Sequence, residues 1–153
     1  MNTINPRRRS LLAAVALLPL AAHAQLRTEI QVYKSAACGC CKDWIKYLQA
    51  NGFVVKATDV GDTAPLRARF GLPARFGSCH TAMVDGYVVE GHVPVREIRR
   101  LLTERPTAVG IAVPHMPIGS PGMDGPAYKG QRDPYDVLLV MADGSSQVYA
   151  SYN

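Results

Sequence analysis

The segment Val32-Tyr33-Lys34-Ser35-Ala36-Ala37-Cys38-Gly39-Cys40-Cys41-Lys42-Asp43-Trp44 carries three of the four cysteines of this 153-residue chain. Apolar residues at Ile30 and Val32 predict a strand before the cysteines, and the apolar pattern from Trp44 to Leu48 predicts a helix after them. The three thiols therefore fall at the N-terminus of a helix. Free N–H groups and the helix dipole favour thiolate over thiol at such a position.

The elements predicted around this segment follow the order βαβ and then ββα. They are strands at Glu29–Lys34 and Phe53–Ala57 around a helix that ends near Ala50, a short helix over Pro65–Phe70, strands at Thr81–Val84 and Tyr87–Glu90, and a helix from about Val95. Asp85-Gly86 predicts a tight hairpin between the last two strands. This order is typical of a thioredoxin-like α/β domain. In that arrangement the loop that carries Cys79 and His80 abuts the turn with the other three cysteines.

The C-terminal part of the chain has a different character. Residues 108–123 are dense in proline and glycine, which predicts a loop. Tyr135–Met141 and Ser146–Tyr152 predict two strands joined at Asp143-Gly144. Two strands cannot bury a face alone, so we expect this β-hairpin to pack on the main body rather than form a second domain.

The N-terminus has the pattern of a secretory signal peptide. Three arginines at 7–9 precede an apolar run from Leu11 to Leu20, and Ala22-His23-Ala24 is a typical cleavage site. We expect residues 1–24 to be removed near Ala24, leaving residues 25–153 as a single domain in the bacterial periplasm, with no membrane span. The formal charge of +5 falls to +2 without the three leader arginines, and no basic stripe is visible, so no nucleic-acid partner is expected.

The cysteine spacing leaves several chemistries open. Cys38-x-x-Cys41 has the spacing of a redox pair, and the extra thiol of Cys40 favours a soft-metal site because thiolates prefer Cu(I) or Zn(II). Adjacent thiolates at Cys40 and Cys41 suit a polynuclear thiolate cluster, which Cu(I) favours, better than one tetrahedral zinc ion. Two structural disulfides among the four cysteines are the alternative.

Histidines and methionines supply further candidates. His80 directly follows Cys79 and can ligate a metal or tune the thiols, or can be an ordinary loop or core histidine. Met116 and Met123 are candidate ligands, because thioethers bind Cu(I) and do not form disulfides, although methionines are common core filler. His115 lies beside Met116 and is a weaker candidate. His92 is left outside the predicted site.

Four blocks of this sequence together resemble the CopG-like family of small periplasmic proteins associated with copper resistance. They are Cys38–Trp44, Ser78–Ala82, Tyr87–Pro94 and Gly119–Met123. The resemblance implies a thioredoxin-like fold, copper bound by cysteines and a redox role in copper or thiol handling. Carried over by position, the implied thiol ligands are Cys38, Cys40, Cys41 and Cys79.

The leading hypothesis is a periplasmic copper-binding protein of metal resistance. Its cysteines would hold Cu(I), alone or in a cluster, and interconvert Cu(I) and Cu(II), with other periplasmic copper-handling proteins as partners. The alternative is a thiol–disulfide oxidoreductase acting on a protein partner, with Cys38 as nucleophile and Cys41 as resolving thiol. A disulfide-stabilised binding module is the third possibility. The sequence does not decide whether the chain is an enzyme, although a copper or thiol oxidoreductase is compatible with these residues.

Overall fold

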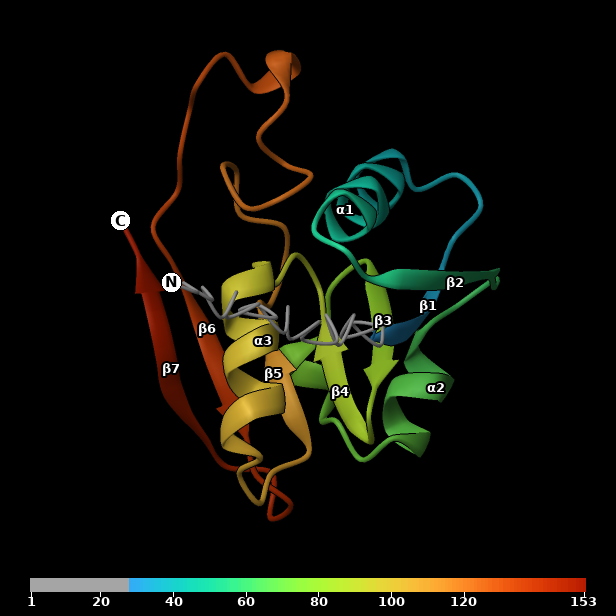
Figure 1. Cartoon of the computed structure of the whole chain (residues 1–153), viewed down its shortest axis with the longest axis vertical. Helices are drawn as coiled ribbons and strands as arrows, with labels where there is room; N and C mark the ends of the chain where they lie inside the picture. The colour runs from blue at the N-terminus through green and yellow to red at the C-terminus, as the bar shows by residue number, and fades with distance from the viewer. Residues whose placement is uncertain (1–27) are drawn as a thin grey trace, which may run out of the picture.

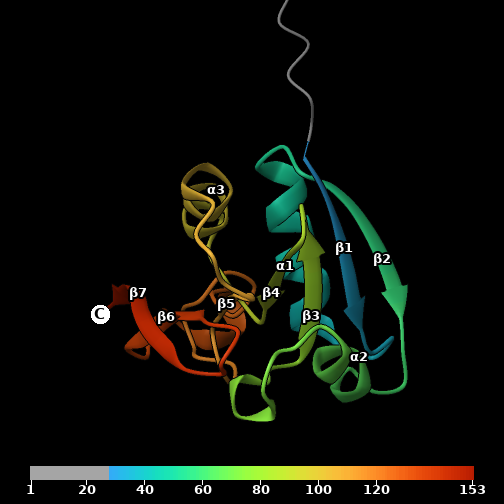
Figure 2. The same cartoon turned by 90° about the horizontal axis from the view of Figure 1, so that it is seen from below.

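A single mixed β-sheet forms the centre of the computed structural model, which describes residues 28–153. The predicted signal peptide lies outside the described residues. Within them the strands follow the order β2-β1-β3-β4-β5-β6-β7, and Figure 2 shows β2 and β7 at opposite edges. No helix among residues 28–153 is both long enough and apolar enough to cross a bilayer.

The first half of the chain has the βαβ and ββα order that the sequence predicts. Its elements are β1 (Glu29–Lys34), α1 (Gly39–Ala50), β2 (Val54–Asp59), α2 (Ala64–Arg69), the 3-10 turn η1 (Ala74–Phe76), β3 (His80–Val84), β4 (Tyr87–Glu90) and α3 (Val95–Glu104). Strand β1 pairs in parallel with β2 and antiparallel with β3. Asp85 and Gly86 both have positive φ, as a tight hairpin between β3 and β4 requires. The thioredoxin-like assignment beyond this order stays a prediction.

Helices α1 and α3 both contribute to the larger of two apolar clusters. It contains Trp44 and Leu48 of α1 and Ile98 and Leu101 of α3, all of them fully buried. Each such side chain contributes about 1.5–3 kcal/mol by leaving water. Neighbouring residues of β4 point to opposite faces of the sheet, so that Val89 joins this cluster while Val88 joins the second one. The start of α1 is thereby anchored on the sheet.

The second cluster contains Leu72 and Phe76, which follow α2 in the chain. The segment from α2 to η1 therefore covers the sheet face opposite α1 and α3. This segment leads directly into the loop with Cys79, so its packing helps to place that cysteine.

Part of the predicted proline- and glycine-rich loop is a strand, which corrects the sequence analysis. Strand β5 (Gly110–Ala112) pairs in parallel with β4 and antiparallel with β6. A Cβ atom at Gly110 would lie 1.9 Å from the carbonyl oxygen of Val88, so glycine permits the close approach of the two strands. Through β5 the predicted C-terminal hairpin, β6 (Tyr135–Val140) and β7 (Ser146–Tyr152), extends the main sheet by edge pairing.

The rest of the predicted loop, residues 113–134, runs between β5 and β6 and contains the 3-10 turn η2 (Pro126–Tyr128). Figure 1 shows this segment, in orange, rising above the sheet at the same end of the molecule as α1. A segment remote in sequence from the cysteine motif is thus available to cover it.

Candidate metal centre

Cys38 caps the N-terminus of α1. Its backbone is extended, with φ −72° and ψ 101°, and its Sγ atom accepts a hydrogen bond of 3.3 Å from the N–H of Cys41. The Cys38 N–H in turn donates to the carbonyl oxygen of Ser35, which closes the turn after β1. Cys38 is partly exposed, whereas Cys41 is fully buried. The strand–turn–helix therefore presents one accessible and one buried sulfur at a helix N-terminus.

A disulfide joins Cys38 and Cys41, the two residues predicted as a redox pair. Their Cα atoms lie 5.4 Å apart, within the range that a disulfide spans. Cys40 and Cys79 have free thiols. The site thus holds one disulfide and two thiols, and the redox activity of the pair stays a prediction.

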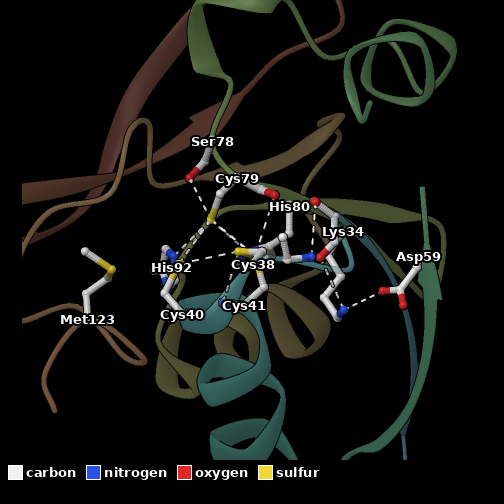
Figure 3. Close-up of a disulfide and its surroundings, with 12 residues drawn as sticks. Lys34, Cys38, Cys40, Cys41, Asp59, Ser78, Cys79, His80, His92 and Met123 are labelled. Carbon is white, nitrogen blue, oxygen red and sulfur yellow. Dashed lines mark hydrogen bonds and ion pairs between the residues drawn. A yellow bond between two sulfur atoms is a disulfide. The ribbon is translucent and has the colours of Figure 1, made fainter. Parts of the chain in front are cut away.

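Cys79 brings the fourth sulfur to the same place, as Figure 3 shows. Its Sγ atom lies 3.5 Å from that of Cys41 and 3.9 Å from that of Cys40. The Cys40 and Cys38 sulfurs are 3.5 Å apart. All four sulfur atoms lie within 4.8 Å of one another, which is close enough for one ion or a small cluster to contact them all.

Two imidazole rings also face Cys79. The Nδ1 atom of His80 lies 3.3 Å from the Cys79 sulfur, and the Nε2 atom of His92 lies 3.1 Å from it. Both rings are fully buried, and that of His80 lies against Trp44 with ring centroids 4.3 Å apart. Cys79 with these two histidines forms a second group of potential metal ligands that shares its sulfur with the first.

His92 is the residue that the sequence analysis missed. The hairpin register pairs Val84 with Tyr87 and Thr81 with Glu90. Continuing that register by two residues sets His92 opposite Cys79. The Asp85-Gly86 turn fixes this register, so the signal was present in the sequence.

Burial keeps the groups around Cys79 neutral. Burial, together with the neighbouring Cys40 thiol, raises the pKa of Cys79 to about 12. Burial and the proximity of His92 lower the pKa of His80 from 6.5 to about 3, and burial also lowers the pKa of His92. A metal cation would reverse this preference, because a positive ion stabilises the thiolate that burial disfavours.

Hydrogen bonds define how the two rings can act. The His92 Nδ1 atom lies 2.8 Å from the carbonyl oxygen of Pro121, which can only accept, so this nitrogen carries the proton. Nε2 of the neutral ring then directs a lone pair toward Cys79. Among residues 28–153, the buried His80 Nε2 is a side-chain polar atom without a hydrogen-bond partner. The donor set of thiols and neutral imidazoles fits a soft or borderline metal.

The segment Pro121–Met123 lies directly on the cysteine turn. A Cβ atom at Gly122 would lie 2.7 Å from the backbone nitrogen of Trp44 and 2.8 Å from the carbonyl oxygen of Cys40. Met123 is 8 % exposed, and its Sδ atom accepts a hydrogen bond of 3.1 Å from the Tyr128 hydroxyl. Figure 3 shows Met123 with its sulfur on the side of Cys40 and His92. This segment therefore covers the thiol site.

Met116, the other methionine predicted as a candidate copper ligand, lies in a different environment. It is 48 % exposed and lines a surface groove of about 620 Å³. Other residues of the groove include Arg75, Phe76, His115 and Tyr135. The groove adjoins the cysteine loop, because the Ser78 hydroxyl donates to the carbonyl oxygen of His115.

Comparison with known proteins relates the chain to copper resistance. Two solved structures, described as "Copper resistance protein copG- Form 2" and "Copper resistance protein copG- Form 1", are each 46% identical to it. The first has a TM-score of 0.77 and the alignment covers 83% of this chain and 99% of that one; for the second the values are 0.76, 82% and 98%. The family described as "Protein of unknown function, DUF411" matches residues 76–123. No curated protein matches the sequence.

Proposed function

The chain belongs to the family of the copper resistance protein CopG, and we propose that it binds Cu(I) through the sulfur atoms of its four cysteines. The observation that carries this proposal is the mutual proximity of the four sulfurs, all within 4.8 Å. Three come from one helix N-terminus and the fourth from a loop 38 residues further along the chain. Thiolates are soft ligands that prefer Cu(I), and closely spaced thiolates can bridge several ions.

His80, His92 and Met123 would complete the site. The two imidazoles face the Cys79 sulfur, and the thioether of Met123 lies in the covering segment. Imidazole and thioether are both copper ligands in proteins. For Met116 we keep a weaker role as a surface ligand, since it is half-exposed in the groove.

The redox chemistry of the site would couple copper to the Cys38–Cys41 disulfide. Two thiols and two Cu(II) ions give one disulfide, two Cu(I) ions and two protons. The S–S bond forms, its two electrons reduce the two copper ions, and the protons leave to water. The reverse reaction opens the disulfide and oxidises two Cu(I) ions. The site would thus interconvert Cu(I) and Cu(II) in copper resistance, in the periplasm if the predicted signal peptide is cleaved near Ala24.

Anaerobic titration tests the binding. The reduced protein is titrated with Cu(I) against a chelator of known affinity, and the Cys38→Ser and Cys79→Ser variants are compared with Ser145→Ala in the β6–β7 turn. We expect both cysteine variants to lose copper capacity and the control to keep it. X-ray absorption should then show sulfur ligation, with short copper–copper distances if a cluster forms. Equal Cu(I) binding by the parent and both cysteine variants would refute the proposal.

A thiol–disulfide oxidoreductase is the second candidate function. The partly exposed Cys38 at a helix N-terminus, disulfide-bonded to a buried Cys41, favours it. In this function Cys38 would attack a partner disulfide and Cys41 would resolve the mixed disulfide. Rapid disulfide exchange by the metal-free protein, abolished in Cys38→Ser, would support it. Slow exchange that copper alone accelerates would favour copper chemistry instead.

A further inference from the structure

The chain around Cys79 is attached to a buried ion pair that the proposed copper chemistry does not use. Glu90, at the end of β4, is fully buried, and its Oε1 atom accepts a hydrogen bond of 2.9 Å from Nε of Arg67 on α2. Arg67 is itself 8 % exposed. A buried ion pair has a high desolvation cost, and well-packed apolar residues often stabilise a fold as well. The stability of the fold alone therefore does not explain the Arg67–Glu90 pair, and its hydrogen bonds indicate a further role.

The pair holds both polar groups of the Ser78 backbone. The Ser78 N–H donates to Glu90 Oε1 at 2.7 Å, and Nη2 of Arg67 donates to the Ser78 carbonyl oxygen at 3.2 Å. That carbonyl belongs to the peptide bond that joins Ser78 to Cys79. The peptide planes before and after Ser78 are thus each held by a charged group, the first by Glu90 and the second, which leads into Cys79, by Arg67.

The same carboxylate also holds the chain after Cys79. The other oxygen of Glu90, Oε2, accepts a hydrogen bond of 2.6 Å from the hydroxyl of Thr81. Apart from each other, the Arg67 and Glu90 side chains bond the Thr63 hydroxyl, the Ser78 backbone and the Thr81 hydroxyl. Ser78 and Thr81 lie on either side of Cys79 in the chain. Cys79 itself lies outside any helix or strand, so these contacts supply the order that regular structure would otherwise give.

Gly77 shows how closely the loop follows the guanidinium group. A Cβ atom at this position would lie 2.9 Å from both Cζ and Nη1 of Arg67. The φ angle of Gly77 is −63°, which any residue adopts, so space rather than backbone conformation favours glycine here. Gly77 and Ser78, the two residues before Cys79, therefore both lie against the Arg67 guanidinium group.

We propose that the Arg67–Glu90 pair is a positioning device for Cys79. By holding the Ser78 backbone before this residue and the Thr81 side chain after it, the pair keeps the Cys79 sulfur 3.5 Å from that of Cys41 and within 3.3 Å of a nitrogen of each imidazole ring. Three sulfurs arrive together on α1, whereas the fourth depends on this pair. The proposal rests on the proposed function only for its purpose, which is to complete the copper-binding set.

Alkylation of the metal-free protein tests the device without copper. With the Cys38–Cys41 disulfide intact, Cys40 and Cys79 are the two free thiols, and peptide mapping after brief iodoacetamide treatment gives both rates. In Glu90→Gln and Arg67→Met we expect the Cys79-to-Cys40 rate ratio to rise about tenfold, because a buried charged hydrogen-bond network is broken. Thr81→Val removes one donor and keeps the strand shape; it should raise the ratio less.

Glu97→Gln is the matched control. Glu97 is also a buried carboxylate, held by Arg96 and Tyr152 on α3 and β7, and it makes no hydrogen bond to the cysteine loop. It should leave the ratio unchanged. If Glu90→Gln and Arg67→Met fail to fold, the Cys79-to-Cys40 alkylation ratio of Thr81→Val alone tests the proposal. An unchanged ratio, or equal acceleration of both thiols, overturns the proposal. Cu(I) titration of the same variants is separate: a raised ratio with unaltered copper binding would refute the proposed function and leave the positioning role standing.

Discussion

The Nε2 atom of His92 lies 3.1 Å from the Sγ atom of Cys79, while Nδ1 of the same ring is held by the Pro121 carbonyl oxygen at 2.8 Å. One imidazole therefore links the fourth cysteine to the segment that covers the site. The hydrogen bond to Pro121 fixes the tautomer and leaves the lone pair of Nε2 facing the sulfur. This is the arrangement in which a histidine either ligates a metal or orients a ligand.

Replacing His92 should weaken copper binding. In His92→Gln we expect Cu(I) affinity to fall by about tenfold, since loss of a ligand or of its orienting partner has effects of this size. Chelator competition under anaerobic conditions measures it. His115→Asn, which changes an exposed histidine of the groove, is the control and should bind like the parent. Equal losses in the two variants would count against a role for His92.

The covering segment can be displaced by a single methyl group. Gly122 and Gly130 both have positive φ, 85° and 74°, so alanine at either position adds roughly 1–2 kcal/mol of backbone strain. Only at Gly122 would the methyl group also collide with α1, at the backbone of Trp44 and Cys40. Thermal unfolding and Cu(I) competition should therefore show a larger loss of stability and affinity in Gly122→Ala than in Gly130→Ala. Matching behaviour of the two variants would mean that contact with this segment is unimportant.

The two methionines of the predicted loop should differ in effect. Met123 is buried beside the thiol site, whereas Met116 is half-exposed in the groove. Leucine keeps the volume and removes the thioether, so Met123→Leu should lower Cu(I) affinity by about threefold to tenfold while the fold is kept. Met116→Leu should have little effect. Competition titrations decide between them, and a larger loss in Met116→Leu would reverse the assignment.

Local patterns in the sequence predicted much of the frame of the site. The strand before Cys38, the helix after it and the Asp85-Gly86 hairpin all occur in the structure. These features depend on side-chain periodicity and turn chemistry over a few residues, which a single sequence displays.

The features that were missed depend on contacts between distant segments. Strand β5 lies in a run rich in proline and glycine, and its pairing requires the close approach of Gly110 to Val88. The Arg67–Glu90 pair joins a helix to a strand 23 residues away, and no local pattern distinguishes these residues from ordinary surface charges. The position of His92 is a long-range contact that the sequence does contain, since extending the Asp85-Gly86 hairpin register by two residues beyond Thr81 and Glu90 sets His92 opposite Cys79.

Acid should destabilise the metal-free protein through His80. Its pKa is about 3 in the folded state, because the ring is fully buried, and 6.5 is the ordinary value that applies on unfolding. Between these values the unfolded chain binds the extra proton, so stability is present at pH 7 and is lost as the pH falls. From pH 7 to pH 5 the loss from this residue is about 2 kcal/mol. Urea unfolding of the disulfide-bonded, metal-free protein at the two pH values measures it.

His80→Phe isolates this contribution. Phenylalanine keeps an aromatic ring against Trp44, where the centroids are 4.3 Å apart, and cannot take up a proton. We expect the free energy of unfolding to fall less between pH 7 and pH 5 in this variant than in the parent. Some loss should persist, because burial also lowers the pKa of His92. If His80→Phe kept the parent's dependence, His80 would take up its proton equally in the folded and unfolded states, and the lowered pKa of His80 would be refuted.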